Sequence, residues 1–229
     1  KAGQFLHVHR VPPIGAVFLG FSLLVLAFPF TQACYWLISQ LPLPTWMMEQ
    51  GEASRKLVAA FLDMETTSAL LMNLVAMALF PALGEELLFR GVVQKLIGKA
   101  TKNAHLSIWV TASLFSFIHF EALGFIPRLL LGALLGYLLY WTNNLWVPIF
   151  AHLVYNASQI FGQYLYLNGN HSIDLENMDH FPWLVIAIST LLVVGIVYAW
   201  SKRSTEHQAA YVNTFDRHHP VFPSQTKRV

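Results

Sequence analysis

Charged residues are scarce in this sequence. Of its 229 residues, only 11% are Asp, Glu, Lys or Arg, whereas 55% are hydrophobic. Soluble domains contain about 25% charged residues on average, so this chain has too few to cover a water-exposed surface. The mean hydropathy of +0.50 and several long apolar runs predict a polytopic membrane protein.

Other features that would indicate particular functions are also missing. Cys34 is the single cysteine, which excludes a disulfide framework or a thiolate metal cluster within the chain. The formal net charge is only +2 and no basic run alternates with aromatic residues, so nucleic acid is not an expected partner. The sequence has no Gly-rich phosphate loop, no HExxH zinc signature and no GxSxG nucleophile motif. Polar residues inside the apolar runs therefore become the main candidates for chemistry.

The apolar runs predict an all-α fold, a transmembrane helical bundle with a polar intramembrane cavity. About 20 apolar residues cross a bilayer as a helix. By this rule we expect about six spans, at residues 14–41, 68–95, 105–120, 126–141, 145–166 and 181–200. Residues 1–200 are expected to form one transmembrane domain and residues 201–229 a polar, loosely ordered tail. The loop at residues 42–67 is expected to contain an amphipathic helix at the membrane surface.

The Lys and Arg residues between the spans predict the orientation of the chain. With six spans, one side of the membrane receives Lys1, Arg10, Lys95, Lys99, Lys102, Lys202, Arg203, Arg217, Lys227 and Arg228. The other side receives Arg55, Lys56 and Arg128. Because positively charged loops stay in the cytoplasm, both termini are predicted to be cytoplasmic.

Polar side chains interrupt three of the predicted spans. They are Glu85, Glu86 and Arg90 on the second span, His119 on the third, and His152 and Asn156 on the fifth. An ionisable group at the centre of a membrane helix costs roughly 2.5–3.5 kcal/mol on insertion scales. Such groups almost always face the protein interior or a water-filled cavity and pair with one another. We therefore expect all six side chains to surround one site.

Helical spacing gives the adjacent carboxylates different surroundings. Glu86 and Arg90 are four residues apart, so they share a helix face and are expected to pair. Glu85 lies about 100° further round the helix, which leaves its carboxylate free to face a cavity. His152 and Asn156 are also four residues apart and share a face.

Several kinds of chemistry fit this set of residues. In hydrolysis, Glu85 is the general base for a water that His119 helps to orient, while His152 and Asn156 stabilise the oxyanion. In a metal site, Glu85, His119 and His152 are three zinc ligands and water is the fourth. A Glu and His chain can also relay protons in a carrier. Each polar residue taken alone can also be a purely structural interhelical hydrogen-bonding group.

Three short motifs follow one another on these spans. The stretch "EELLFR" fits Glu-Glu-x-x-x-Arg, "FSFIH" fits Phe-x-x-x-His, and "HLVYN" fits His-x-x-x-Asn. Together they resemble the CAAX-protease and bacteriocin-processing family of intramembrane endopeptidases, also called the ABI family, and its type II CAAX prenyl proteases. The resemblance covers about residues 81–159, inside an expected protease core at residues 68–166.

The resemblance implies an all-helical membrane protease whose site opens to the cytoplasm. It matches Glu85 and His119 to the pair that activates water, and His152 and Asn156 to the pair that stabilises the oxyanion. The family is often described as metalloproteases, yet a metal-free glutamate mechanism is also argued for it. We favour no cofactor over zinc, because asparagine is an unusual zinc ligand and only three plausible ligands remain.

The same resemblance matches Glu86 and Arg90 to residues that support the site. It implies a peptide or protein substrate at the lipid bilayer. A catalytically idle bacteriocin-immunity or scaffold protein and a proton-coupled carrier remain as alternatives. Because the short chain has nothing resembling a eukaryotic targeting extension, a bacterial inner membrane is the expected location.

Overall fold

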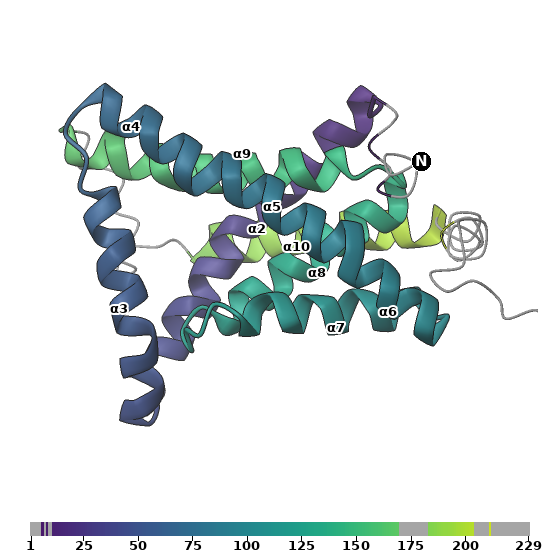
Figure 1. The fold of residues 1–229 in the computed structure, drawn as a ribbon, viewed down its shortest axis with the longest axis horizontal. Coiled ribbons are helices and arrows are strands. Elements are labelled where there is room, and N and C mark those ends of the chain that lie inside the picture. The colour runs from purple at the N-terminus through teal and green to yellow at the C-terminus, as the bar shows by residue number, and fades with distance from the viewer. Residues whose placement is uncertain (1–5, 7, 9–10, 170–182, 204–210, 212–229) are drawn as a thin grey trace, which may run out of the picture.

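The predicted all-α fold is confirmed by the structure, a computed structural model that describes residues 6, 8, 11–169, 183–203 and 211 (Figure 1). Within these residues the chain forms helices and contains no strand. The acidic stretch at residues 170–180, most of the predicted tail, and the basic residues Lys1, Arg10, Arg217, Lys227 and Arg228 lie outside the described residues.

The helices follow the predicted spans closely. Most are single α-helices, with bounds α2 Ile14–Ser39, α3 Thr45–Leu62, α7 Ala104–Phe117, α8 Phe125–Thr142, α9 Trp146–Leu167 and α10 Trp183–Arg203. The second span is a continuous helical stretch with two π-helical segments, in the order α4 Thr67–Asn73, π-helix Leu74–Leu79, α5 Phe80–Leu88, π-helix Phe89–Val93 and α6 Gln94–Thr101.

Four helices in the described part of the chain are long and apolar enough to cross a membrane, namely Ile14–Ser39, Thr67–Thr101, Phe125–Thr142 and Trp183–Lys202. The other two predicted spans differ from these. Helix α7 is apolar but has only 14 residues. Helix α9 has 22 residues, and polar side chains such as His152 and Asn156 lower its mean hydropathy.

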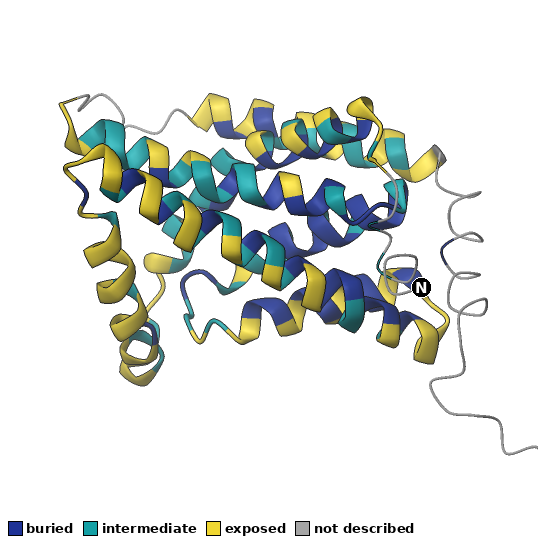
Figure 2. Ribbon diagram, turned by 45° about the horizontal axis from the view of Figure 1, so that its top comes forward, coloured by how far each residue is buried: buried dark blue, intermediate teal, exposed yellow. Residues whose placement is uncertain are grey.

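The centre of the bundle is formed by α2, α8 and α9. Helix α2 packs against both α8 and α9, α7 packs along α8, and the 67–101 stretch lies beside α9. Figure 2 shows the buried residues gathered where these helices meet. Buried leucines from α2 and α8, among them Leu23, Leu24, Leu138 and Leu139, form much of the core.

Two tight turns make neighbouring helices antiparallel. Lys102 ends α6 in a left-handed conformation, and the side chain of Asn103 then caps α7 by accepting from Leu106 N at 3.0 Å. Asn143 ends α8 in the same way, and Asn144 Oδ1 accepts from Trp146 N at 3.0 Å at the start of α9. These turns place the ends of α6 and α10 at one end of the bundle and α3 at the opposite end (Figure 1).

The predicted helix within residues 42–67 is present as α3, which leaves the bundle at a steep angle (Figure 1). Trp46, Leu57 and Phe61 are exposed along it, whereas Gly51 is buried. An exposed apolar stripe on an amphipathic helix is typical of helices that lie at a membrane surface. The position of α3 at such a surface stays a prediction.

Tyr211 differs from the expectation of a loosely ordered tail. Its side chain is 1% exposed and belongs to the hydrophobic core. An aromatic residue within a polar segment carried no periodicity that could have indicated this contact.

Candidate functional site

Two π-helical segments flank α5, the helix that carries Glu85 and Glu86. A π-helical segment changes the direction in which the following side chains point, and such segments occur frequently at functional sites. The sequence analysis treated the second span as a regular helix, because no residue pattern distinguishes a π-helical segment from an α-helix. The paired glutamates therefore lie between two irregular segments of one helix.

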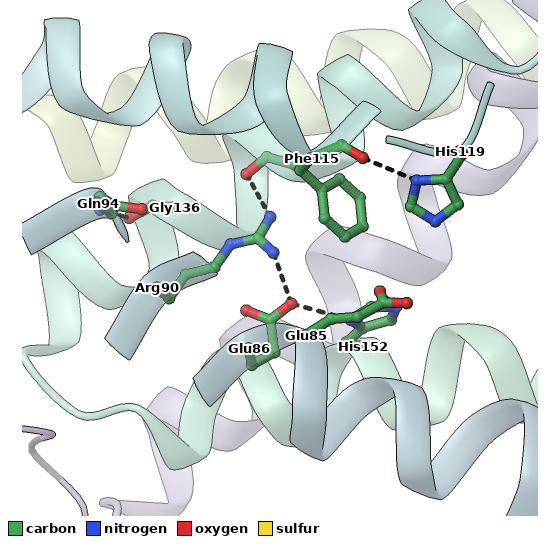
Figure 3. Close-up of polar contacts among 9 residues, drawn as sticks. Glu85, Glu86, Arg90, Gln94, Phe115, His119, Gly136 and His152 are labelled. Atoms are coloured by element: carbon green, nitrogen blue, oxygen red, sulfur yellow. Dashed lines mark hydrogen bonds and ion pairs between the residues drawn. The ribbon is translucent and has the colours of Figure 1, made fainter. Parts of the chain in front are cut away.

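Glu86 and Arg90 form the predicted ion pair, with both side chains fully buried. Arg90 Nη1 donates to Glu86 Oε1 at 2.8 Å. Arg90 Nη2 donates to the backbone carbonyl of Gly132 on α8 at 2.9 Å. Figure 3 shows Arg90 and Glu86 together with the neighbouring side chains. The arginine therefore joins the 67–101 helix to α8 while it neutralises Glu86.

His152 on α9 joins the same pair. Its Nδ1 lies 2.9 Å from Glu86 Oε1, and because the carboxylate paired with Arg90 can only accept, Nδ1 carries the proton of this bond. The other ring nitrogen, Nε2, lies 3.8 Å from Glu85 Oε2. The Glu85 side chain is 28% exposed, whereas that of Glu86 is 0% exposed. The two adjacent carboxylates thus have different environments, one neutralised and buried, the other partly open.

The Phe115 ring lies close to Arg90 and to both imidazoles. The Arg90 guanidinium is 4.7 Å from the centre of its ring. The rings of His119 and His152 lie 5.1 Å and 6.2 Å from the same ring, edge-on. The sequence analysis quoted Phe115 only as the first residue of its motif and gave it no role. In the structure this ring separates Arg90 from His119.

His119 follows the last turn of α7 and makes a hydrogen bond to the backbone of this helix. Its Nδ1 lies 2.7 Å from the carbonyl oxygen of Phe115. Because a carbonyl can only accept, Nδ1 is the protonated nitrogen, and Nε2 of the neutral ring is free to accept. Figure 3 shows the His119 ring and the Glu85 carboxylate on the side of Phe115 away from Arg90.

Asn156 contacts the helix that carries the glutamates. Its Nδ2 donates to the carbonyl oxygen of Met77 at 3.3 Å. In a regular α-helix this carbonyl would accept from residue 81, but Pro81 has no N–H. Met77 lies in the π-helical segment Leu74–Leu79, and Asn156 gives its carbonyl a hydrogen-bond donor from α9. No hydrogen bond in the described part of the chain joins Asn156 or His119 to Glu85.

Two glycines of α8 let the helices around the site approach closely. A Cβ at Gly132 would lie 3.2 Å from Phe115 Cδ1, and a Cβ at Gly136 would lie 2.9 Å from Gln94 Oε1. Gln94 Nε2 also donates to the Gly136 carbonyl at 3.3 Å. Arg90 and Gln94, one helical turn apart, thus bond to glycine carbonyls one turn apart on α8. The sequence analysis missed this contact, although "GALLG" is a small-xxx-small pattern typical of membrane helix interfaces.

The predicted zinc ligands do not form a metal site. Among the described residues, which include Glu85, His119 and His152, no three His, Cys, Asp or Glu side chains form a group that could hold a metal ion. Glu85 and His152 approach each other, but His119 does not join them in such a group. The zinc alternative therefore does not fit this arrangement of the three side chains.

The comparisons with known proteins concern the segment that contains this site. Residues 67–158 match the family model described as type II CAAX prenyl endopeptidase Rce1-like, a family of intramembrane proteases. The uncharacterized protein YpbD of Bacillus subtilis (strain 168) is 34% identical over 89 residues. That match covers 37% of this chain and 42% of YpbD, so less than half of either chain is aligned. No solved structure matches the chain.

The matched segment includes all six of the polar residues singled out above, and the resemblance inferred from three motifs is confirmed. The long apolar helices in the described part of the chain make it a multi-pass membrane protein. Residues 67–158 are therefore similar to the type II CAAX prenyl endopeptidase Rce1-like family.

Proposed function

We propose that this chain is an intramembrane endopeptidase that hydrolyses a peptide bond of a peptide or protein substrate near the membrane. The observation that carries the proposal is the contrast between two neighbouring carboxylates. Glu86 is buried and paired with Arg90, whereas Glu85 is partly exposed and lies beside Nε2 of His152. An unpaired carboxylate next to an imidazole, inside an apolar protein, is an arrangement suited to general base catalysis.

Glu85 and His119 are the proposed water-activating pair. The Glu85 carboxylate takes a proton from water while the water oxygen attacks the substrate carbonyl carbon. His119 accepts a hydrogen bond from the same water through Nε2, because its Nδ1 proton is engaged by the Phe115 carbonyl. When the C–N bond breaks, the proton held by Glu85 passes to the leaving nitrogen, and both products depart with no net change in the enzyme.

His152 and Asn156 are the proposed donors to the oxyanion. Asn156 Nδ2 has two hydrogens, and its bond to the Met77 carbonyl uses one of them. The second is available to a substrate. His152 acts in this role when Nε2 carries a proton, with its ring fixed by the bond from Nδ1 to Glu86. Donors that are oriented before the charge develops are worth the most to the rate.

Glu86 and Arg90 are proposed to support the site and to take no part in proton transfer. Glu86 Oε1 receives bonds from both Arg90 and His152. Arg90 is in turn fixed by the Gly132 carbonyl and the Phe115 ring. This fully buried network sets the orientation of the His152 ring, much as an outer carboxylate orients a catalytic histidine in other hydrolases.

We also propose that the protein resides in a bacterial inner membrane with both termini in the cytoplasm. The described basic residues support this orientation. Lys99 and Lys102 end the 67–101 helix and Lys202 and Arg203 end α10, at the same end of the bundle (Figure 1). Such an excess of basic residues favours the cytoplasmic side.

The test is cleavage of candidate membrane peptides by the purified full chain in lipid nanodiscs, followed by mass spectrometry. Glu85→Ala and His119→Ala are each expected to lower the rate by roughly 10²–10⁴-fold. Cleavage that survives both substitutions would refute the mechanism. A chelator is expected to leave the rate unchanged; loss of activity with recovery on adding zinc would restore the metal alternative. Peptide binding without cleavage by the wild type would favour the idle immunity or scaffold protein.

A further inference from the structure

Three charged residues meet at the end of the bundle where α3 lies. They are Arg55 on α3, Glu121 in the connection between α7 and α8, and Arg128 on α8; we call them the clasp. Arg128 Nη2 donates to Glu121 Oε2 at 2.7 Å and to the Glu121 carbonyl at 3.0 Å. Arg55 Nη1 lies 3.6 Å from Glu121 Oε1. The Glu121 side chain is only 10% exposed, so the clasp is a partly buried network and its bonds are shielded from water.

Two glycines lie directly against the side chains of the clasp. A Cβ at Gly51 of α3 would lie 2.6 Å from Glu121 Cγ and 2.7 Å from Arg55 Nη1. A Cβ at Gly124 would lie 2.5 Å from Arg128 Cζ. Because neither glycine has a side chain, Glu121 can lie against α3 at Gly51 and the Arg128 guanidinium can lie against the backbone at Gly124. Arg55 Nη2 also donates to the Met48 carbonyl at 2.9 Å, which fixes its side chain along α3.

The clasp holds a chain segment that begins at a proposed catalytic residue. Glu121 is two residues beyond His119, and Phe120 between them has φ +48°. Aromatic residues rarely adopt this left-handed conformation, and it persists only where the surrounding contacts enforce it. Ser116 Oγ donates to the Phe125 carbonyl at 2.6 Å and ties the two ends of the connection together. The clasp adds the ion pairs of Glu121, the residue directly after the left-handed one.

We infer that Arg55, Glu121 and Arg128 are positioning residues for His119. By fixing Glu121, they hold the turn at Phe120 and so set the direction of the His119 ring toward the Glu85 side of Phe115. The inference rests on the proposed function, in which His119 orients the water. It extends the working part of the protein to α3, which lies outside the segment matched to the family at residues 67–158.

Two glycine substitutions test the inference without removing a charge. Gly51→Ala displaces Glu121 and Arg55, and Gly124→Ala displaces Arg128. The matched control is Gly195→Ala on α10, where a Cβ would meet nothing within 4 Å. Alanine is a better helix former than glycine, so a loss of activity in Gly51→Ala cannot come from a weaker α3 helix.

The readouts are the kinetic constants on a cleaved peptide and hydrogen exchange of residues 118–124. We expect both clasp variants to lower kcat roughly 10- to 100-fold, the effect of misplacing a catalytic group by about 1 Å, with KM within about twofold of the wild type. The rate of hydrogen exchange of residues 118–124 is expected to rise in both clasp variants. Gly195→Ala is expected to change neither kcat nor this exchange rate. Wild-type kcat or wild-type exchange in Gly51→Ala would overturn the inference.

A charge inversion separates positioning from general damage. Glu121→Arg alone places three cations together and is expected to lower kcat as strongly as Gly51→Ala. Adding Arg55→Glu and Arg128→Glu restores the attraction with all signs reversed, and we expect at least a fivefold recovery of kcat. If neither kcat nor the protection of residues 118–124 from hydrogen exchange recovers in the triple variant, the inference is overturned. If the wild type cleaves no peptide, the proposed function fails, and exchange in the same variants still decides whether the clasp holds this segment.

Discussion

At the scale of single residues, the network around Glu86 places opposite charges side by side in the buried interior. Arg90 and Glu86 are fully buried and form an ion pair with N–O distance 2.8 Å. Removing one partner of such a pair leaves an uncompensated buried charge, which is far more costly than losing the attraction alone. Glu85, by contrast, is partly exposed, and its Oε2 lies 3.8 Å from Nε2 of His152.

This difference predicts that substitutions at the two glutamates fail in different ways. Glu86→Gln is expected to lower the free energy of unfolding by about 3–5 kcal/mol, because the Arg90 charge stays buried without its partner. Glu85→Gln is expected to change stability by less than about 1 kcal/mol while lowering the cleavage rate by roughly 10²–10⁴-fold. The measurement is denaturant unfolding in the same detergent for both variants.

The control for this prediction removes both charges together. Glu86→Gln combined with Arg90→Gln is expected to recover at least about 1 kcal/mol of the stability lost in Glu86→Gln, since neither ion is then left alone in the interior. A double variant that is less stable than Glu86→Gln would show that Arg90 is held mainly by Gly132 and Phe115, and that its pairing with Glu86 matters little.

The sequence predicted part of this network and not the rest, for a definable reason. The Glu86–Arg90 pair follows from spacing on one helix, so it could be read from the sequence. The sharing of Glu86 Oε1 between Arg90 and His152 depends on how α9 is rotated against α5. The central place of Phe115 depends likewise on packing between α7, α8 and the 67–101 helix. Rotations of that kind leave no trace in the spacing of polar residues.

At the scale of helices, close packing on α8 decides how the site is held. Gly132 and Gly136 present bare backbone to α7 and to the 67–101 helix, so that Arg90 and Gln94 reach their carbonyls. In membranes, small residues and interhelical hydrogen bonds supply much of the helix association. The apolar runs predicted that these helices exist, but they did not predict the two π-helical segments or the position of α9 as a more polar helix.

Gly136→Ala tests this packing. Its Cβ would lie 2.9 Å from both Ile108 Cγ2 and Gln94 Oε1, so overpacking is expected to destabilise the protein by about 1–3 kcal/mol. Gly195→Ala, in open surroundings, is expected to be neutral or to stabilise by up to about 1 kcal/mol. Thermal unfolding of the two variants should therefore shift in different directions. Equal behaviour would contradict a packing role for Gly136.

At the scale of the whole molecule, one side chain links the far C-terminal segment to the core beneath the site. Tyr211 packs edge-on against Tyr140 with ring centres 5.5 Å apart, and Gln94 Nε2 donates to its hydroxyl at 2.9 Å. Gln94 also binds the Gly136 carbonyl, one turn beyond the contact of Arg90 with Gly132. A residue more than a hundred positions from Gln94 in sequence thus completes the same row of contacts, and only the three-dimensional arrangement could show it.

Removing this contact is therefore expected to weaken the bundle, although Tyr211 lies beyond the end of α10 at Arg203. Tyr211→Ala should lower the free energy of unfolding by about 3–5 kcal/mol, as for other buried aromatic residues, and Tyr211→Phe by about 1 kcal/mol through the lost hydrogen bond. Tyr198→Ala, at a residue 60% exposed on α10, should stay within about 0.5 kcal/mol of the wild type.

Burial raises the pKa of Tyr211 from 10.0 to about 12. The folded state thus keeps this proton longer than the unfolded state does, so the contribution is full below pH 10 and is lost as the pH rises toward 12. The free energy of unfolding, measured between pH 10 and pH 12, should fall more steeply with pH for the wild type than for Tyr211→Phe. Identical slopes for the two proteins would show that the Tyr211 hydroxyl is exposed to water.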